Sequence, residues 1–245
     1  MSKISFYQNR ICLNVLAKDP ENARDIYEAT EGHVLIGVLS KQFATAEEAL
    51  PVLDAYKQAT NDAVSIGLGA GDPNQWRAVV EISELTAPAH VNQIFSKVGV
   101  TREAVGQNES WINGLVHPAG RVGYVKAAIG DGEPIEMGTA EAIDRIRAMG
   151  GNAVKYFPMN GLETKEQYLD VVRCCAETDF AIEPTGGLDL SNFREIVEIA
   201  LQAGVKQVIP HVYSSIIDKE TGKTNIEDVK QLYEVMKELG DSYGE

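Results

Sequence analysis

The segment AVKYFPMNGLETKEQYLDVVRCCAETDFAIEPTGG, residues 153–187, begins and ends with a short β-rich stretch. AVKYFP (153–158) and AIEPT (181–185) are strand candidates, and the residues between them are numerous enough for a crossover helix. Units of this kind build a parallel sheet whose faces are covered by helices.

The same alternation of strand and helix candidates extends along the chain. Because eight strands with helices between them fit a closed sheet, we expect an α/β fold, a (β/α)8 TIM barrel, rather than its main alternative, an open doubly wound sheet. The length of 245 residues fits one such barrel as a single domain, residues 1–245. The other strand candidates are ICLNVLA (11–17), VLIGVLS (34–40), AVSIGLG (63–69), AHVNQIF (89–95), YVKAAI (124–129) and QVIPHV (207–212).

One stretch breaks this alternation. Residues 100–121, which contain WINGLVHPAGR, have a helix-forming part too short for a full crossover. We therefore expect a loop or hairpin inserted there, before a fifth barrel strand at 124–129.

The composition limits the classes of partner. The net charge of −14 argues against general binding of nucleic acid or of an anionic membrane. No apolar run reaches the roughly 18 residues of a membrane helix, and the start of the chain has no long apolar stretch. The three cysteines form no metal-binding spacing and no even disulfide framework. We expect a cytoplasmic protein that acts on a small molecule.

Lys155 stands in the middle of an apolar strand candidate. Alternation places Ala153, Lys155 and Phe157 on one face and Val154 and Tyr156 on the other. Lysine is seldom buried without a partner. Lys155 is therefore either a core lysine paired with a carboxylate or a nucleophilic amine whose pKa is lowered by burial. The strand alone does not decide between them.

The next strand candidate carries a carboxylate and a glycine pair. Alternation places Glu183 and Thr185 on one face. If the two strands are neighbours, Glu183 can face Lys155 or a substrate bound to it. Gly186 and Gly187 follow at the carboxyl end of the strand, where barrel active sites lie and where glycine leaves backbone N–H groups accessible to anions.

Together, VKYFPMN (154–160) and EPTGGL (183–188) resemble the corresponding strands of class I 2-dehydro-3-deoxyphosphogluconate aldolases, which read like K-(F/L)-F-P-A-E and P-T-G-G. The closest resemblance is to the aldolase family of bacterial D-glucosaminate breakdown, often labelled 4-hydroxy-2-oxoglutarate aldolases. IGLGAGDPNQW (66–76) is similar to the family segment G-A-G-T-x-x-x-P-x-Q. The resemblance implies a TIM-type barrel in which Lys155 forms a Schiff base and residues 185–187 lie near the substrate carboxylate or phosphate.

The chain departs from the better-known branch of these aldolases, which carries E-V-T-L-R-T on its second strand. Ile36 stands where the glutamate would be, and Ser40 stands where the arginine would be. We therefore expect Glu183 to be the proton-transfer group and Lys41 to be one donor to a substrate anion.

The last strand candidate also departs from the family pattern. It lacks the G-G-S phosphate motif, and the segment PHVYSSII offers only Ser214 and Ser215 as hydroxyl donors. His211, near the end of this strand, is a candidate for substrate contact and the second candidate for proton transfer. Lys126 in YVKAAI is the alternative nucleophile, but no Schiff-base pattern follows it.

The expected reaction is cleavage of a 2-keto-3-deoxy sugar acid, in particular 2-dehydro-3-deoxy-6-phosphogluconate, to pyruvate and glyceraldehyde 3-phosphate. An amine nucleophile needs neither a metal nor an organic cofactor, and we expect neither. We also expect a homo-oligomer. The alternatives are a 4-hydroxy-2-oxoglutarate aldolase, a metal-dependent aldolase or phosphosugar isomerase on the same barrel, and a non-catalytic barrel that binds sugar acids.

Overall fold

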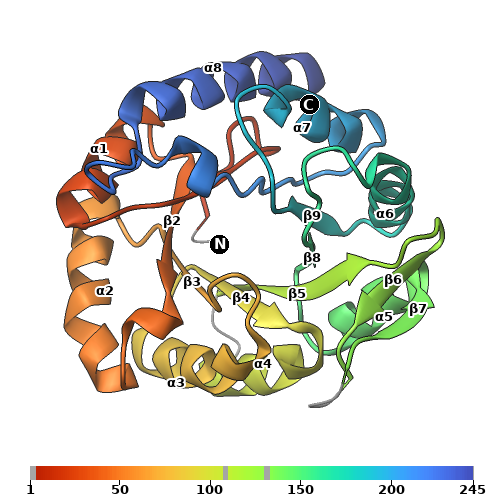
Figure 1. Ribbon diagram of the computed structural model, residues 1–245, viewed down its shortest axis with the longest axis horizontal. Helices are drawn as coiled ribbons and strands as arrows, with labels where there is room; N and C mark the ends of the chain where they lie inside the picture. The colour runs from red at the N-terminus through yellow and green to blue at the C-terminus, as the bar shows by residue number, and fades with distance from the viewer. Residues whose placement is uncertain (1–3, 107–109, 130–132, 245) are drawn as a thin grey trace.

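The computed structural model describes residues 4–106, 110–129 and 133–244. Parallel strands form a closed barrel, and an outer ring of helices surrounds it (Figure 1). This architecture confirms the predicted (β/α)8 barrel. The helices are α1 (Pro20–Ala29), α2 (Ala46–Thr60), α3 (Trp76–Thr86), α4 (Val98–Val105), α5 (Thr139–Ala148), α6 (Lys165–Glu177), α7 (Phe193–Gln202) and α8 (Ile226–Tyr243).

The barrel strands follow one another in chain order. Residues 207–212 take the eighth place, where single bridges join His211 to Asn14 on one side and to Thr185 on the other. These bridges close the ring between the last strand and the first. The other seven barrel strands are β1 (Leu13–Leu16), β2 (Val34–Leu39), β3 (Val64–Gly67), β4 (His90–Ile94), β5 (Trp111–Pro118), β8 (Ala153–Tyr156) and β9 (Ala181–Pro184).

The inserted hairpin lies later in the chain than predicted. Residues 100–121 contain most of α4 and the whole of β5, which pairs in parallel with β4 and β8 as the fifth barrel strand. The hairpin is instead formed by β6 (Tyr124–Ala127) and β7 (Ile135–Gly138), antiparallel to β5 and to each other. Only a short turn separates β5 from β6, and a parallel pair would need a crossover of a dozen or more residues.

Several 3₁₀ helices follow barrel strands and help to form the loops at the carboxyl ends of the sheet. They are η1 (Ser40–Gln42), η2 (Pro73–Gln75), η3 (Phe95–Lys97) and η4 (Ser214–Ile216).

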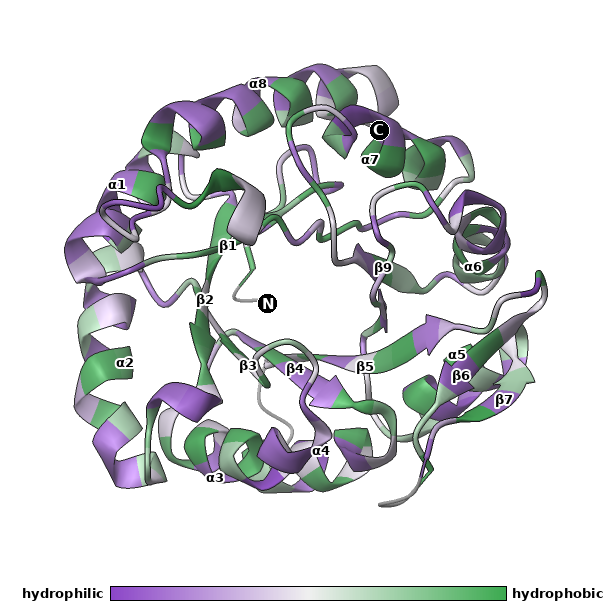
Figure 2. Cartoon of the chain, in the orientation of Figure 1, coloured by the Kyte–Doolittle hydropathy of each residue, from purple (hydrophilic) through white to green (hydrophobic). Residues whose placement is uncertain are grey.

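The helices of the outer ring carry both hydrophobic and hydrophilic residues (Figure 2). Helix α2 shows how the sequence fixes a boundary: Thr45 accepts a hydrogen bond from the Glu48 backbone N–H at 3.3 Å, as an N-cap does. On β8, the Tyr156 ring stacks on Tyr168 of α6, so Tyr156 faces the helices. The alternation of the strand then turns Lys155 into the barrel.

The interior of the barrel is polar. Seven of its eight strand positions contribute a buried polar side chain, and such groups must find hydrogen-bond partners. These buried polar side chains are Asn14, Ser65, His90, Asn92, Asn113, Lys155, Glu183 and His211.

No helix among the described residues is long and apolar enough to cross a membrane.

The Gly151→Ala substitution tests the close packing between α5 and the turn that leads from it into β8. A Cβ atom at Gly151 would lie 2.5 Å from Ile146 Cγ2 and 3.0 Å from the Ile146 backbone oxygen. We expect overpacking to lower the free energy of unfolding by about 1–3 kcal/mol, measured by urea denaturation. Gly99→Ala in α4 is the control, because its Cβ would lie 3.7 Å from Met149 and alanine favours the helix by about 1 kcal/mol. Equal effects of the two substitutions would contradict the packing argument.

Candidate active site

Lys155 is a buried amine with neutral hydrogen-bond partners. Its Nζ donates to Asn92 Oδ1 at 2.8 Å and lies 3.4 Å from His211 Nδ1. Burial lowers the pKa of Lys155 to about 8, although the charge of Glu183 opposes this shift. A useful fraction of the amine is therefore neutral, and able to act as a nucleophile, near neutral pH.

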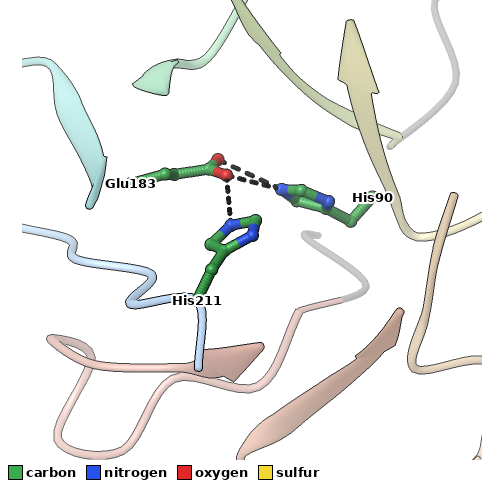
Figure 3. A group of neighbouring side chains, drawn as sticks. All are labelled: His90, Glu183 and His211. Atoms are coloured by element: carbon green, nitrogen blue, oxygen red, sulfur yellow. Dashed lines mark hydrogen bonds and ion pairs between the residues drawn. The ribbon is translucent and has the colours of Figure 1, made fainter. Parts of the chain in front are cut away.

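Glu183 is a fully buried carboxylate that accepts hydrogen bonds from four side chains. Figure 3 shows the two histidines among them, His90 and His211. Oε1 accepts from Trp111 Nε1 at 2.9 Å and from His90 Nε2 at 3.1 Å. Oε2 accepts from Asn113 Nδ2 at 2.5 Å and from His211 Nε2 at 2.9 Å. Burial alone would raise the pKa of this carboxyl, but its interactions with the two histidines outweigh burial and hold the pKa well below the usual range. Glu183 is thus ionised, and its acceptor positions are occupied by protein donors.

The carboxylate fixes the orientation of both histidines. Because a carboxylate only accepts, the Nε2 atom of each ring must carry the hydrogen. His90 Nδ1 lies 2.8 Å from Ser65 Oγ, which also accepts a hydrogen bond from Asn92 Nδ2 at 3.0 Å. His211 Nδ1 remains as an acceptor directed at Lys155. Burial and the positive charge of Lys155 lower the pKa of His211, so this ring is neutral at neutral pH.

His90, Glu183 and His211 also have the ligand types of a catalytic zinc site. One donor atom from each lies within 4.8 Å of the others. The hydrogen bonds favour a proton network over a metal site, because both Nε2 atoms donate to the carboxylate and Trp111 and Asn113 donate to the same oxygens. A metal ion would have to displace these hydrogens.

A cavity of about 330 Å³ opens above Lys155 at the carboxyl ends of the strands. Two glycine-containing loops border it: Gly69–Ala70–Gly71 after β3, and Gly186–Gly187 after β9. All five residues have positive φ angles, and their N–H groups have no hydrogen-bond acceptor among the residues that the structure describes. The Lys41 side chain lies against Gly69. The remaining lining residues include Asn92, Leu115, Lys155, Phe157, Thr185, Leu188, His211, Tyr213 and Ser214.

Most of the predicted site residues meet at this cavity. The register of β8 with β9 pairs Lys155 with Glu183, as expected for neighbouring strands. Glu183 itself lies outside the cavity lining, so its carboxylate does not reach a substrate there directly. Ser215 is also outside the lining, because its hydroxyl donates to the Leu188 backbone oxygen at 2.7 Å. Lys126 is exposed on the hairpin, away from the cavity. The lining residues that the sequence predicted are Lys41, Lys155, Thr185, Gly186, Gly187, His211 and Ser214.

Sequence reasoning missed most of the donors around Lys155 and Glu183. A signal was present, because Asn14, Ser65, His90 and Asn92 are polar residues within otherwise apolar strand candidates. Spacing by two places His90 and Asn92 on one face of β4. Trp111 and Asn113 lay in the segment expected to be an insertion.

The chain is similar in sequence to aldolases over most of its length. A family model described as KDGP aldolase matches residues 7–220. A relative from Salmonella typhimurium (strain 14028s / SGSC 2262), named 2-dehydro-3-deoxy-phosphogluconate aldolase, is 44% identical over 98% of this chain and 100% of its own length.

Two solved structures show the same fold at low identity. The structure described as "Native KDPGal structure" is 14% identical, with a TM-score of 0.56 over 94% of this chain and 96% of its own. A mutant tryptophan synthase alpha-subunit from Pyrococcus furiosus is 16% identical, with a TM-score of 0.61 over 95% of this chain and 99% of its own.

The reactivity of Lys155 should follow its lowered pKa. Only a neutral amine reacts with an acylating reagent, so labelling of Lys155 should rise with pH and level off above about 8, whereas ordinary lysines continue to rise to about 10.4. Peptide mapping after brief acetic anhydride treatment at each pH measures this. Glu183→Gln removes the charge that raises the Lys155 pKa, so the midpoint should move to lower pH. An unchanged midpoint in this variant would contradict the electrostatic coupling.

Proposed function

We propose that this chain, which belongs to the KDGP aldolase family, is a class I aldolase in which Lys155 forms a Schiff base with the C2 carbonyl of a 2-keto-3-deoxy sugar acid. The chain is a carbon–carbon lyase, and the C3–C4 bond of the substrate is the bond that breaks. The observation that carries the assignment of Lys155 is a buried amine of lowered pKa at the base of a cavity, with neutral groups as its contacts.

Lys155 supplies the covalent step. Its neutral amine attacks C2, and loss of water leaves an iminium ion, which can accept the electron pair of the C3–C4 bond. Asn92 Oδ1 holds the amine in position before attack. Cleavage releases an aldehyde and leaves the enamine of pyruvate, and protonation at C3 and hydrolysis then free pyruvate and Lys155.

We assign proton transfer to His211 and a supporting role to Glu183, which revises the role that the sequence suggested. His211 lines the cavity, and its Nδ1 atom is an acceptor that lies 3.4 Å from Lys155 Nζ and 3.0 Å from the Tyr213 hydroxyl oxygen. Glu183 lies behind it and accepts the Nε2 hydrogen at 2.9 Å. A buried carboxylate in this place fixes the tautomer of the imidazole and stabilises the imidazolium that forms, as in other acid–base catalysts.

The two glycine loops support a substrate with an anionic group at each end. Thr185 follows the strand that pairs with β8, so residues 185–187 lie beside Lys155 and suit the carboxylate next to C2. Lys41 follows β2, which stands across the barrel from β8 in the strand order, and it suits a more distant anion. We propose 2-dehydro-3-deoxy-6-phosphogluconate as substrate, with its phosphate at Lys41 and residues 69–71 and with glyceraldehyde 3-phosphate as product.

Cytoplasmic location and self-association remain proposals. Three free, buried cysteines support a reducing compartment. Exposed hydrophobic side chains on and beside the hairpin, at Val122, Tyr124 and Ile135, support contact between copies of the chain.

Borohydride reduction in the presence of pyruvate tests the nucleophile. We expect a stable pyruvate adduct on the Lys155 peptide and loss of activity, both read by mass spectrometry and a pyruvate-release assay. Lys155→Arg keeps the charge but offers no usable neutral amine, so it should abolish turnover and labelling. Lys126→Met is the control and should behave like the wild-type protein. Turnover that survives borohydride but is lost with a chelator would contradict the proposal and favour a metal at His90, Glu183 and His211.

Substitution of Lys41 by methionine tests the distant anion site. The variant keeps most of the aliphatic side chain that lies on Gly69 and loses the charge. We expect KM for the phosphorylated substrate to rise by about tenfold or more, corresponding to roughly 1.4 kcal/mol for a lost charged contact, with little change for the unphosphorylated analogue. An equal rise for both compounds would place the carboxylate at Lys41. Unchanged KM values would remove Lys41 from the site.

A further inference from the structure

We propose that Tyr213 is a catalytic residue that passes the proton between the substrate and His211, so that Tyr213, His211 and Glu183 act as one relay. The proposal rests on the aldolase function proposed above. It adds a hydroxyl group that the sequence did not indicate and gives that group a defined step in the reaction.

The three side chains form a continuous path from the cavity to the buried carboxylate. Tyr213 lines the cavity beside Lys155 and His211. Its hydroxyl oxygen lies 3.0 Å from His211 Nδ1, and His211 Nε2 lies 2.9 Å from Glu183 Oε2. Both ring nitrogens of His211 are thus engaged, one toward the cavity and one toward the carboxylate.

The Tyr213 hydroxyl has two acceptors for its single hydrogen. Asn14 Oδ1 lies 3.1 Å from the hydroxyl oxygen, almost as close as His211 Nδ1. The Asn14 amide nitrogen donates to Ser65 Oγ at 3.2 Å, so its oxygen is turned toward Tyr213. The hydroxyl can therefore rotate its hydrogen from Asn14 to His211 without leaving its place. Burial and the charge of Glu183 raise the pKa of Tyr213, so it acts as a neutral hydroxyl rather than as a phenolate.

The cleavage step balances in this arrangement. The substrate C4 hydroxyl gives its proton to the Tyr213 oxygen while the Tyr213 hydrogen moves to His211 Nδ1. The C3–C4 electron pair moves into the iminium ion, which becomes a neutral enamine, and the C4 oxygen becomes the aldehyde carbonyl. The positive charge thus passes from the iminium nitrogen to His211, which is hydrogen-bonded to the Glu183 carboxylate. Since the net charge of the buried site does not change, the step avoids creating an unpaired charge away from water.

The reverse transfer completes the reaction. His211 returns a proton to Tyr213, and the Tyr213 hydroxyl protonates C3 of the enamine, which restores the iminium ion for hydrolysis. One relay therefore serves both proton transfers, and the enzyme must also exchange the methyl protons of pyruvate with solvent. This partial reaction needs no aldehyde, so it measures the relay separately from cleavage.

Tyr213→Phe is the direct test, with Tyr56→Phe as the matched control. The Tyr56 hydroxyl donates to the Ala17 backbone oxygen at 3.3 Å, and Tyr56 is outside the cavity lining. We expect Tyr213→Phe to lower both kcat and deuterium uptake into the pyruvate methyl group, followed by NMR, by about 10²–10⁴-fold, the usual value of acid–base assistance. Borohydride trapping of pyruvate on Lys155 should persist in this variant, and Tyr56→Phe should match the wild type.

The alternative is that His211 receives the substrate proton directly. In that case Tyr213→Phe would keep both rates within about threefold of the wild type, and the relay proposal would be wrong. Single-turnover cleavage by the wild-type protein in H₂O–D₂O mixtures tests the relay without a variant. Two protons in motion give a curved dependence of rate on deuterium fraction, and a linear dependence would overturn the relay. Failure of the wild type to trap pyruvate or exchange its methyl protons would instead count against the proposed aldolase function.

Discussion

The hydrogen bonding of one buried carboxylate organises the interior of this barrel. Glu183 has no contact with solvent, and an ionised carboxylate in such a place is strongly unfavourable unless donors surround it. The donors come from β4, β5 and residues 207–212, which supply His90, Trp111, Asn113 and His211. A shift of any one of these strands by one residue would turn its donor to the opposite face, so the carboxylate specifies their register.

The same network sets the protonation state of Lys155. Asn92 donates to Ser65 and accepts from both Lys155 and Asn113, and Asn113 also donates to Glu183. The amine is therefore connected to the carboxylate through two neutral amides rather than by direct contact. A direct ion pair would hold Lys155 in its charged form. The observed separation instead lets burial dominate, which lowers the pKa of Lys155 to about 8.

The position of the proposed acid–base group distinguishes this chain from the better-known branch that it resembles. That branch carries a glutamate on its second strand, where this chain has Ile36. Here the carboxylate stands on β9, next to the strand of the lysine, and is separated from the cavity by His211. The difference between the two branches is more than the position of one carboxylate. The His211 imidazole, hydrogen-bonded to the Glu183 carboxylate, faces the cavity in place of a carboxylate, and both groups come from other strands than β2.

The sequence by itself determined the barrel, because strand and helix periods alternate along the chain and a parallel sheet needs those crossovers. It also determined that Lys155 shares a strand face with Ala153 and Phe157 and that Glu183 lies on the next strand candidate, since both depend on local alternation and chain order. Which face of β8 points into the barrel was decided by the structure, where Tyr156 stacks on Tyr168 of α6. The sequence misplaced the hairpin, although the short turn between β5 and β6 excludes a parallel pair. Only the tertiary structure decided what Glu183 and Lys155 contact. Their partners are distant in the chain, as His90 and Trp111 are from Glu183, and which of them meet depends on the register of strands around a closed ring. The sequence pattern shows which face of a strand a side chain occupies. Which inward-facing residues of different strands lie at the same level depends on the strand register of the closed barrel.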